Sequence, residues 1–279
     1  MTTLSPTLQR IAISLSREEL YVVMRLLKAT QLPGFDLSWL NAAADGTVPD
    51  DVRHALEVAT NALVARGYLT PQEPTAEEPL KVNMPSPVIA LVGTCAFGID
   101  SILLSLHTAD GPRLMYLHEL RELAVAHTMP VPDIHQFEAI EGRAGMLHVI
   151  EEMLDLRSQT ATTLPAGKVP AVDVQAARDA ALAGKMEEAV ELLVRGGLPA
   201  ITAEALCRAM KESTALGAIS IGKRDAGGQP QDVTLALVIS PTLCFALADA
   251  DVHPAAFHVQ PTSAEALKQW IASSLPQGA

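Results

Sequence analysis

Hydrophobic and polar positions follow two different periods along this chain, and the periods separate expected helices from expected strands. Near the N-terminus an apolar stripe has the 3.6-residue period of an amphipathic helix; its members are Leu20, Val23, Met24 and Leu27. The preceding Ser16-Arg-Glu-Glu19 has the form of a capping box, in which a serine and the glutamate three residues later bond each other's backbone N–H. These positions predict a helix that begins at Ser16.

A second helix is expected between Asp50 and Gly67. Asp50 follows Pro49 and is of the residue type that caps helix N-termini, while Gly67 is of the type that ends helices. The apolar positions of this helix are Val52, Leu56, Ala59 and Leu63. Residues 70–85, which are rich in proline and acidic residues, are expected to form an exposed connection.

From Pro87 onward the period changes to two residues or to solid apolar runs, which is typical of a sheet. The expected strands are Val88–Gly93, Ser101–His107, Arg113–Leu117 and Leu123–Thr128, separated by turn sequences. They predict an antiparallel meander. After it, Asp133 is expected to cap a helix over Ile134–Ile140, with Gly142 behind it.

The same order of patterns recurs at an offset of 129 positions. Arg66-Gly67 recurs as Arg195-Gly196. Further matches at this spacing join Leu20–Leu27 to Val149–Leu156, Val88–Thr94 to Gly217–Lys223, Arg113–Glu119 to Thr242–Ala248, and Pro132-Asp133 to Pro261-Thr262. The chain is therefore predicted to have an α+β fold of two pseudo-twofold-related halves, 1–142 and 143–279, each with helices, an antiparallel meander and a closing helix. Chance similarity in a chain rich in Ala, Leu and Val is the alternative.

One region adds to the second half. Ala176–Ala183, Met186–Val194 and Thr202–Met210 have amphipathic periods and are closely spaced. Because a single helix pair does not make a solenoid, we expect a helical layer that covers the sheet.

Composition narrows the classes of partner. The chain has 279 residues, 49% of them hydrophobic, and a formal charge of −12, which favours a folded chain with a large core. Nucleic acids and anionic membrane surfaces attract clusters of Lys and Arg, and no such cluster is present in the sequence. The three cysteines lack a C-x-x-C pattern, and the N-terminus lacks a basic region before its apolar stretch. We therefore expect a cytoplasmic protein with reduced thiols and neither a nucleic-acid nor a membrane partner.

Cys95 is the strongest candidate for catalysis. It lies between Gly93 and Gly98 after an apolar run, and His107 with Asp100 could complete a Cys-His-Asp set. His118 and Asp110 are alternative members of that set. The segment after Cys95 is expected to be a strand, so no helix N-terminus would activate the thiol. We therefore favour a buried, inert cysteine and no catalytic residues.

No metal or cofactor site is expected. His118-Glu-Leu-Arg-Glu122 lacks the second histidine that would place two metal ligands on one helical face. The glycines of Gly222–Gly228 lack the order of a phosphate-binding loop. His127 and His258 fall at similar places in the two halves, where a packed or solvated imidazole is the more common state than a ligand.

The whole pattern resembles a known family. The first helix reads LSREELYVVMRLLKATQLPGF, and the last repeat contains GAISIGKRD, QDVTLALVISPTLCFALADAD and AFHVQPTSAEALKQWIASSL. In this order of elements the chain resembles the EspG-type chaperones associated with ESX (type VII) secretion. The resemblance implies a cytosolic, non-catalytic protein with a pseudo-twofold α+β core that carries helical bundles.

Three functional hypotheses follow. The favoured one is a non-catalytic cytoplasmic scaffold, a chaperone or adaptor of EspG-like type that docks an apolar helical or extended segment of another protein. The alternative is a small-molecule hydrolase or transferase with Cys95 as its nucleophile. A structural homo-oligomer is the third, with Trp39 and Trp270 as possible interface residues.

Overall fold

The computed structural model of the chain describes residues 11–40, 47–72, 81–98, 100–121, 123–155, 163–224, 230–250 and 255–275. The chain divides into two compact units, of which the first contains residues 1–101 and 115–146 and the second contains 102–114 and 147–279. Each unit combines helices with an antiparallel sheet, so the fold class is α+β, as predicted. No helix in the described part of the chain is long and apolar enough to cross a membrane.

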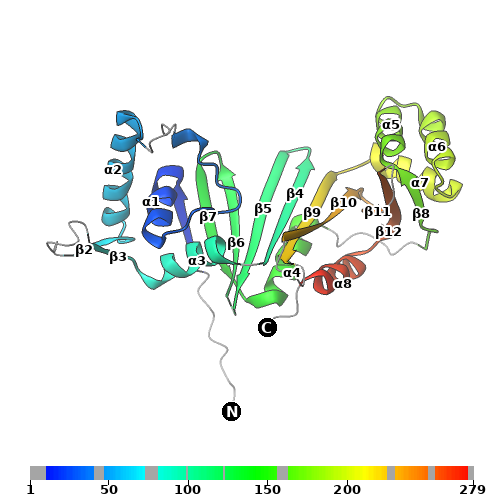
Figure 1. Cartoon of the computed structure of the whole chain (residues 1–279). Coiled ribbons are helices and arrows are strands. Elements are labelled where there is room, and N and C mark those ends of the chain that lie inside the picture. The colour runs from blue at the N-terminus through cyan, green and yellow to red at the C-terminus, as the bar shows by residue number, and fades with distance from the viewer. Residues whose placement is uncertain are drawn as a thin grey trace, which may run out of the picture. The chain divides into compact units, whose positions relative to one another are not determined.

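The first unit has four main strands in the hydrogen-bonded order β1-β7-β6-β5. Its elements are β1 (Ala12–Ser16), α1 (Arg17–Leu27), the 3₁₀ turn η1 (Ser38–Leu40), α2 (Asp50–Ala65), the short strands β2 (Thr70–Gln72) and β3 (Lys81–Asn83), α3 (Ser86–Phe97), β5 (Gly111–Leu120), β6 (Leu123–Val131) and β7 (Ile134–Ile140) (Figure 1). β1 is thus an edge strand, paired with β7 from Ala12 opposite Glu138 to Ser16 opposite Ile134.

The second unit has the strand order β4-β9-β10-β11-β12-β8, with β8 at the edge. Its elements are β4 (Asp100–Thr108), α4 (Gly142–Leu154), β8 (Gly167–Pro170), α5 (Ala171–Leu182), α6 (Met186–Arg195), α7 (Ala200–Lys211), β9 (Ala215–Arg224), β10 (Pro230–Ile239), β11 (Cys244–Ala250), β12 (Ala256–Thr262) and α8 (Ala264–Ser274). Three of these elements cross the division between the units. The first residues of β4 and of α4 belong to the first unit, and residues 111–114 of β5 belong to the second.

Helices cover one face of the sheet in each unit. In the first unit α1, α2 and α3 bury their apolar stripes against Val125 of β6 and Phe137 of β7. In the second unit α5, α6 and α7 do the same against Phe245 of β11 and Val259 of β12. Burial of a large apolar side chain stabilises a fold by about 2 kcal/mol, so these two clusters hold each unit together.

The capping box predicted at Ser16 is confirmed. The Ser16 side chain accepts a hydrogen bond from the Glu19 backbone N–H at 3.2 Å, and Glu19 Oε2 accepts one from the Ser16 backbone N–H at 2.9 Å. The helix that this box begins, α1, ends with Lys28 in the left-handed region at φ 58°. The strands expected at 101–107, 113–117 and 123–128 are also confirmed, as parts of β4, β5 and β6.

Two predicted elements are wrong. Val88–Gly93, expected to be a strand, lies inside helix α3, because an apolar run buried among helices and sheet has no polar side to reveal its period. Ile134–Ile140, expected to be a helix, is strand β7, in which every second residue from His135 faces the core. Asp133 does not cap a helix but occupies the turn before β7 at φ 63°. The N-cap of α2 is Pro49, and Asp50 is its first helical residue.

The offset of 129 positions does not align equivalent elements throughout, because it places helix α3 on strand β9. The order of elements nevertheless occurs twice in the chain. A strand, three helices, four strands and a helix run from β1 to α4 and again from β8 to α8, with the hairpin β2-β3 added only in the first copy. The pseudo-twofold relation and the division at residue 142 stay predictions.

Candidate functional site

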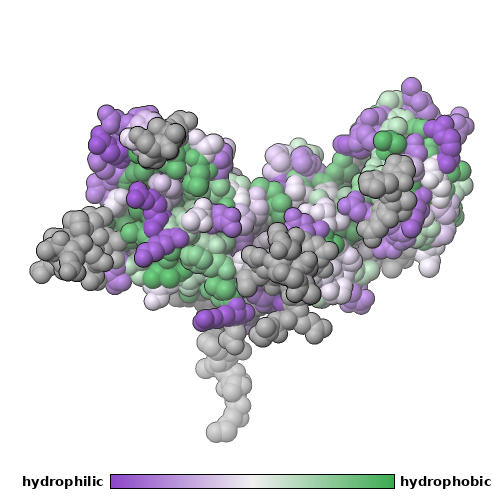
Figure 2. Space-filling view, viewed as in Figure 1, coloured by the Kyte–Doolittle hydropathy of each residue, from purple (hydrophilic) through white to green (hydrophobic). Residues whose placement is uncertain are grey.

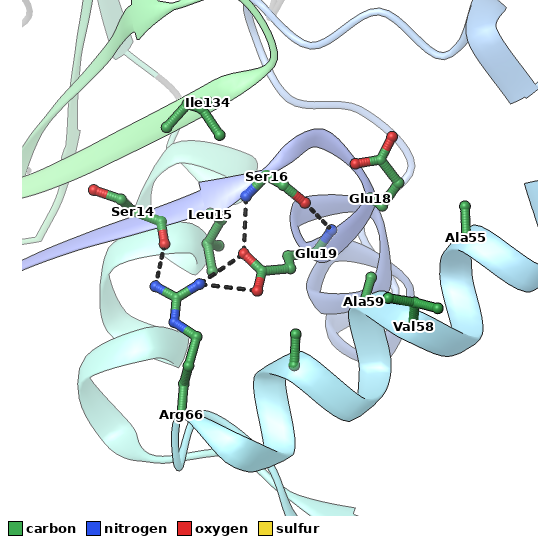
Figure 3. Close-up of a pocket in the computed structure, with 11 residues that line it drawn as sticks. Ser14, Leu15, Ser16, Glu18, Glu19, Ala55, Val58, Ala59, Arg66 and Ile134 are labelled. Carbon is green, nitrogen blue, oxygen red and sulfur yellow. Dashed lines mark hydrogen bonds and ion pairs between the residues drawn. The ribbon is translucent and has the colours of Figure 1, made fainter.

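A surface pocket of about 480 Å³ lies in the first unit between strand β1, the start of α1 and one side of α2 (Figure 3). The residues that line it are Ser14, Leu15, Ser16, Glu18, Glu19, Ala55, Val58, Ala59, Ala62, Arg66 and Ile134. The α2 members recur at helical spacing, so one stripe of that helix forms a wall. Because this stripe consists mainly of alanines, the side chains are too short to fill the space next to β1.

Arg66 lines this pocket at the C-terminal end of α2. It extends from the last turn of α2, and its Nη1 lies 2.7 Å from Glu19 Oε2 and 2.9 Å from Oε1 (Figure 3). Its guanidinium also stacks on the Tyr68 ring at 4.6 Å from the centroid. Burial opposes the charge, but the hydrogen bonds and the charge of Glu19 outweigh it and raise the pKa of Arg66. The Arg66 guanidinium therefore stays charged.

The same ion pair occupies the free edge of β1. The Ile11 carbonyl accepts a hydrogen bond from the Ala139 N–H, so the odd-numbered residues of β1 direct their backbone groups toward β7. The backbone groups of the even-numbered Ser14 and Ser16 therefore face away from β7. The Ser14 carbonyl accepts a hydrogen bond from Arg66 Nη2, and the Ser16 N–H donates to Glu19. Four polar residues of the pocket, Ser14, Ser16, Glu19 and Arg66, are thus bonded to one another. The remaining wall of α2 is apolar and suits the binding of a small apolar group.

A second surface with exposed apolar side chains lies on the helical layer α5–α7. Val172 of α5 is 75% exposed, Ile201 of α7 58%, Leu182 of α5 57% and Val194 of α6 42%. On α5 the exposed residues between Val172 and Leu182 include the polar Gln175 and Asp179, and Gln175 donates a hydrogen bond to Asp179. Figure 2 shows the same mixture of apolar and hydrophilic residues over this layer.

Cys95 lies near the end of helix α3, which replaces the strand expected before it. It is 1% exposed and belongs to the apolar core under α1 and α2. Burial raises the pKa of the Cys95 thiol well above its usual range, so the thiol stays protonated at neutral pH. Burial likewise raises the pKa of Cys207 to about 11 and that of Cys244 to about 12.

The other members of the hypothetical Cys-His-Asp set lie on β4. Asp100 begins that strand, and His107, which is exposed, comes seven residues later. Cys95 is buried in the core of the first unit, whereas His107 is exposed. Among the described residues no group of three His, Cys, Asp or Glu side chains is placed to hold a metal ion.

The sequence predicted a role for Glu19 but did not identify Arg66 as its partner. Ser16 and Glu19 were identified as a capping box, and Arg66 only as the end of a helix. The partners are 47 residues apart, and no spacing rule relates a helix start to the end of the next helix. A lone glutamate that is 6% exposed needs a cation, but only the fold shows which one.

Comparison with known proteins shows a likeness of fold. No model of a protein family matches the sequence, and no curated protein is significantly similar to it. Among solved structures, the fold matches the Mycobacterium tuberculosis type VII secretion system chaperone EspG5, whose structure was determined in complex with a PE25–PPE41 dimer. The TM-score is 0.64 at 14% identity, over 96% of this chain and 98% of EspG5. The EspG-like fold suggested by the sequence is thereby confirmed.

Proposed function

We propose that this chain is a protein-binding chaperone or adaptor of the cytoplasm that holds an apolar segment of a PE–PPE-type partner. The observation that carries the proposal is the likeness of nearly the whole chain to EspG5, a chaperone whose structure holds a PE25–PPE41 dimer. The three free, buried cysteines agree with a reducing compartment. The alternative, a cysteine enzyme, gains no support, because the Cys95 thiol is buried and stays protonated at neutral pH.

The helical layer α5–α7 is the surface that we assign to the partner. Its helices carry the three most exposed large apolar side chains of the described residues, namely Val172, Ile201 and Leu182. Large apolar groups exposed on a rigid helical layer are favourable anchors, because a partner buries them without reordering the backbone. The matching partner element is an amphipathic helix whose apolar stripe meets these side chains.

The direct test is complex formation between purified proteins. The chain is mixed with a panel of PE–PPE-type dimers that includes PE25–PPE41, and the mixtures are separated by size-exclusion chromatography with light scattering. A complex that contains one copy of the chain and one dimer is the expected result. Absence of any complex at concentrations of tens of micromolar across the panel would overturn the proposal.

Charge substitutions then test the assigned surface. We expect Val172→Asp combined with Ile201→Asp to weaken the complex by about tenfold or more, because each places a charge where an apolar anchor is buried on binding. Ile89→Asp combined with Val131→Asp is the matched control, since these first-unit side chains are 43% and 53% exposed and lie outside the pocket beside β1. Equal weakening by both pairs, or no weakening by the first, would contradict the assignment of the surface while leaving complex formation intact.

A further inference from the structure

Three histidines form a buried cluster on the helix-covered face of the first unit's sheet. His127 of β6 lies opposite Tyr116 of β5 in the strand register, and their rings stack with centroids 5.6 Å apart. The His118 ring also stacks with the Tyr116 ring, with centroids 6.4 Å apart. His135 of β7 lies 5.1 Å from His127, and His127 Nε2 and His135 Nδ1 share a hydrogen bond of 2.9 Å.

The burial of these rings is unusual for their chemistry. His118 and His127 are fully buried and His135 is 3% exposed. Neither ring nitrogen of His118 has a hydrogen-bonding partner among the described residues. Buried polar atoms in folded proteins are almost always hydrogen-bonded, so an imidazole with two unpaired nitrogens indicates a cost that the fold tolerates.

The surroundings offer little compensation for positive charge. Asp133, at the start of β7, favours the protonated form of His135, but its carboxylate also pairs with Arg17 of α1 at 3.3 Å. The Pro33 carbonyl favours protonated His127, whereas His118 and His135 oppose it. From the other packed elements come the neutral Tyr116 and Cys95 and, on the covering segment, the fully exposed Asp36, which is bonded to Ser38.

The segment Leu32–Leu40, which contains η1, covers the cluster. The Phe35 ring meets the His135 ring edge-on at 5.4 Å. A Cβ at position 34 would overlap the Tyr116 ring, so Gly34 at φ 79° lets the backbone lie directly on that ring. At the far end of the segment, Trp39 meets Tyr21 at 5.9 Å and lies under the Arg17 guanidinium at 4.6 Å.

We infer that the three histidines act as an acid-sensitive latch: their protonation releases the segment Leu32–Leu40 from the face of the sheet. Phe35 of the segment contacts His135 directly, and Gly34 lies on Tyr116, whose ring stacks with His118 and His127. The segment contains no helix longer than η1. Two or three adjacent imidazolium rings repel one another and require water, which only an opened segment can admit. The latch is independent of the proposed partner and of the α5–α7 surface.

The direction of the pH effect follows from the closed form. Burial lowers the pKa of His118 to about 4 and that of His127 to about 3, with His135 and His118 adding to the second shift. Burial also lowers the pKa of His135. In an open segment each ring would titrate near its ordinary pKa of about 6.5. Above pH 6.5 the rings are mainly neutral in both forms, so protonation does not favour opening. Below pH 6.5, each ring that binds a proton on opening lowers the ratio of closed to open chain by about tenfold per pH unit.

Fluorescence of Trp39 gives a direct reading of the segment. The chain contains two tryptophans, so the Trp270→Phe variant leaves Trp39 as the sole reporter. In this variant we expect the Trp39 emission to shift between pH 6.5 and 4, at a higher pH than the loss of far-ultraviolet circular dichroism. Emission that stays unchanged to pH 4, or that changes only together with the circular dichroism, would overturn the latch.

His118→Leu, added to Trp270→Phe, tests the cluster itself. Because the His118 ring has no hydrogen-bonding partner to lose, the fold should tolerate leucine at pH 8, and the opening should shift to lower pH with one proton fewer. The control, His107→Gln, removes an exposed histidine and should leave the midpoint unchanged. An equal shift in both variants would contradict the inference. NMR titration of the imidazole resonances in the parent chain tests it without any cluster variant: all three rings must take up protons together with the Trp39 transition.

Discussion

The two edge strands of the sheets, β1 in the first unit and β8 in the second, solve the same problem by different means. A free strand edge exposes N–H and C=O groups that another strand can join, so folded proteins cover such edges. At β1 the cover is charged: Arg66 bonds the Ser14 carbonyl and Glu19 bonds the Ser16 N–H. This cover depends on two side chains and on their charges.

At β8 the cover is the backbone of the turn between α6 and α7. A Cβ at Gly197, which has φ 111°, would lie 2.9 Å from the Lys168 carbonyl oxygen. A Cβ at Gly196 would lie 2.7 Å from Val169 Cγ2, and one at Gly167 would lie 2.8 Å from Pro199 Cδ. The second edge is therefore closed by close packing of glycines. Loss of the Arg66 or Glu19 charge should therefore uncover the β1 edge, whereas a larger side chain at one of these glycines should uncover the β8 edge.

The largest effect is expected from Gly197→Ala. Alanine at φ 111° is strained and its Cβ would meet the backbone oxygen of Lys168, so we expect a loss of about 3 kcal/mol in the free energy of unfolding. Gly184→Ala is the control, because Gly184 also has positive φ, 80°, but has nothing within 4 Å of its Cβ position. Urea unfolding should show a loss of about 1 kcal/mol for the control. Equal losses would mean that the contact with β8 has no energetic role.

A smaller loss is expected from Arg66→Ala. The change leaves the buried Glu19 carboxylate without its cation, and we expect a loss of about 2 kcal/mol, because Arg66 itself is partly exposed to water. Arg53→Ala removes the exposed pair with Asp50 and should cost less than about 0.5 kcal/mol. Light scattering adds a second reading, because the uncovered β1 edge should make Arg66→Ala self-associate more than Arg53→Ala does. A variant as stable and as monomeric as Arg53→Ala would refute the charged cover.

Ser16→Ala tests the cap that positions Glu19 at the β1 edge. Loss of the serine side chain removes its bond to the Glu19 N–H, and we expect about 1 kcal/mol of destabilisation in thermal or urea unfolding. Ser263→Ala removes a similar bond at the start of α8 without a glutamate partner three residues later. If the cap also holds the edge closed, Ser16→Ala should cost more than Ser263→Ala. The reverse order would show that the cap and the edge are independent.

The smallest difference is expected between the thiols of the two units. Cys95 of α3 and Cys207 of α7 are both buried, and burial raises the pKa of each. We therefore expect iodoacetamide at pH 7.5 to modify both slowly in the folded chain, and both rapidly in urea, as followed by mass spectrometry of peptides. Rapid modification of Cys95 alone in the folded chain would revive the alternative of a cysteine enzyme with His107 and Asp100.

Local signals predicted the elements that have them. The Ser16–Glu19 box, the meander strands and the helical layer with α6 ending at Arg195 were found from period and caps, because these features act within a few residues. Helix α3 was missed because its twelve residues contain no charge and several β-branched side chains, and only burial on several sides explains that composition. Strand β7 carried a usable period-two signal, with His135 and Phe137 buried, which Asp133 obscured by its likeness to a cap.

The candidate sites depended on tertiary contacts and were less accessible. The pocket joins β1 to a stripe of α2 about forty residues later, and the histidine cluster joins three strands through their register. Nothing in the sequence groups His118 and His127 with each other or with His135. Their proximity follows from the pairing of β5 with β6 and of β6 with β7, which no single segment contains.

The contact between Arg17 and Asp133 bears on how the protein is made. The Arg17 N–H donates to the Asp133 carbonyl at 2.9 Å, and β1 just before it pairs with β7 just after residue 133. A nascent chain emerging from the ribosome therefore carries strand β1 without its partner β7 until more than a hundred further residues have been translated. During that interval the apolar stripe of α1 depends on helices α2 and α3 or on a ribosome-associated folding factor for shelter.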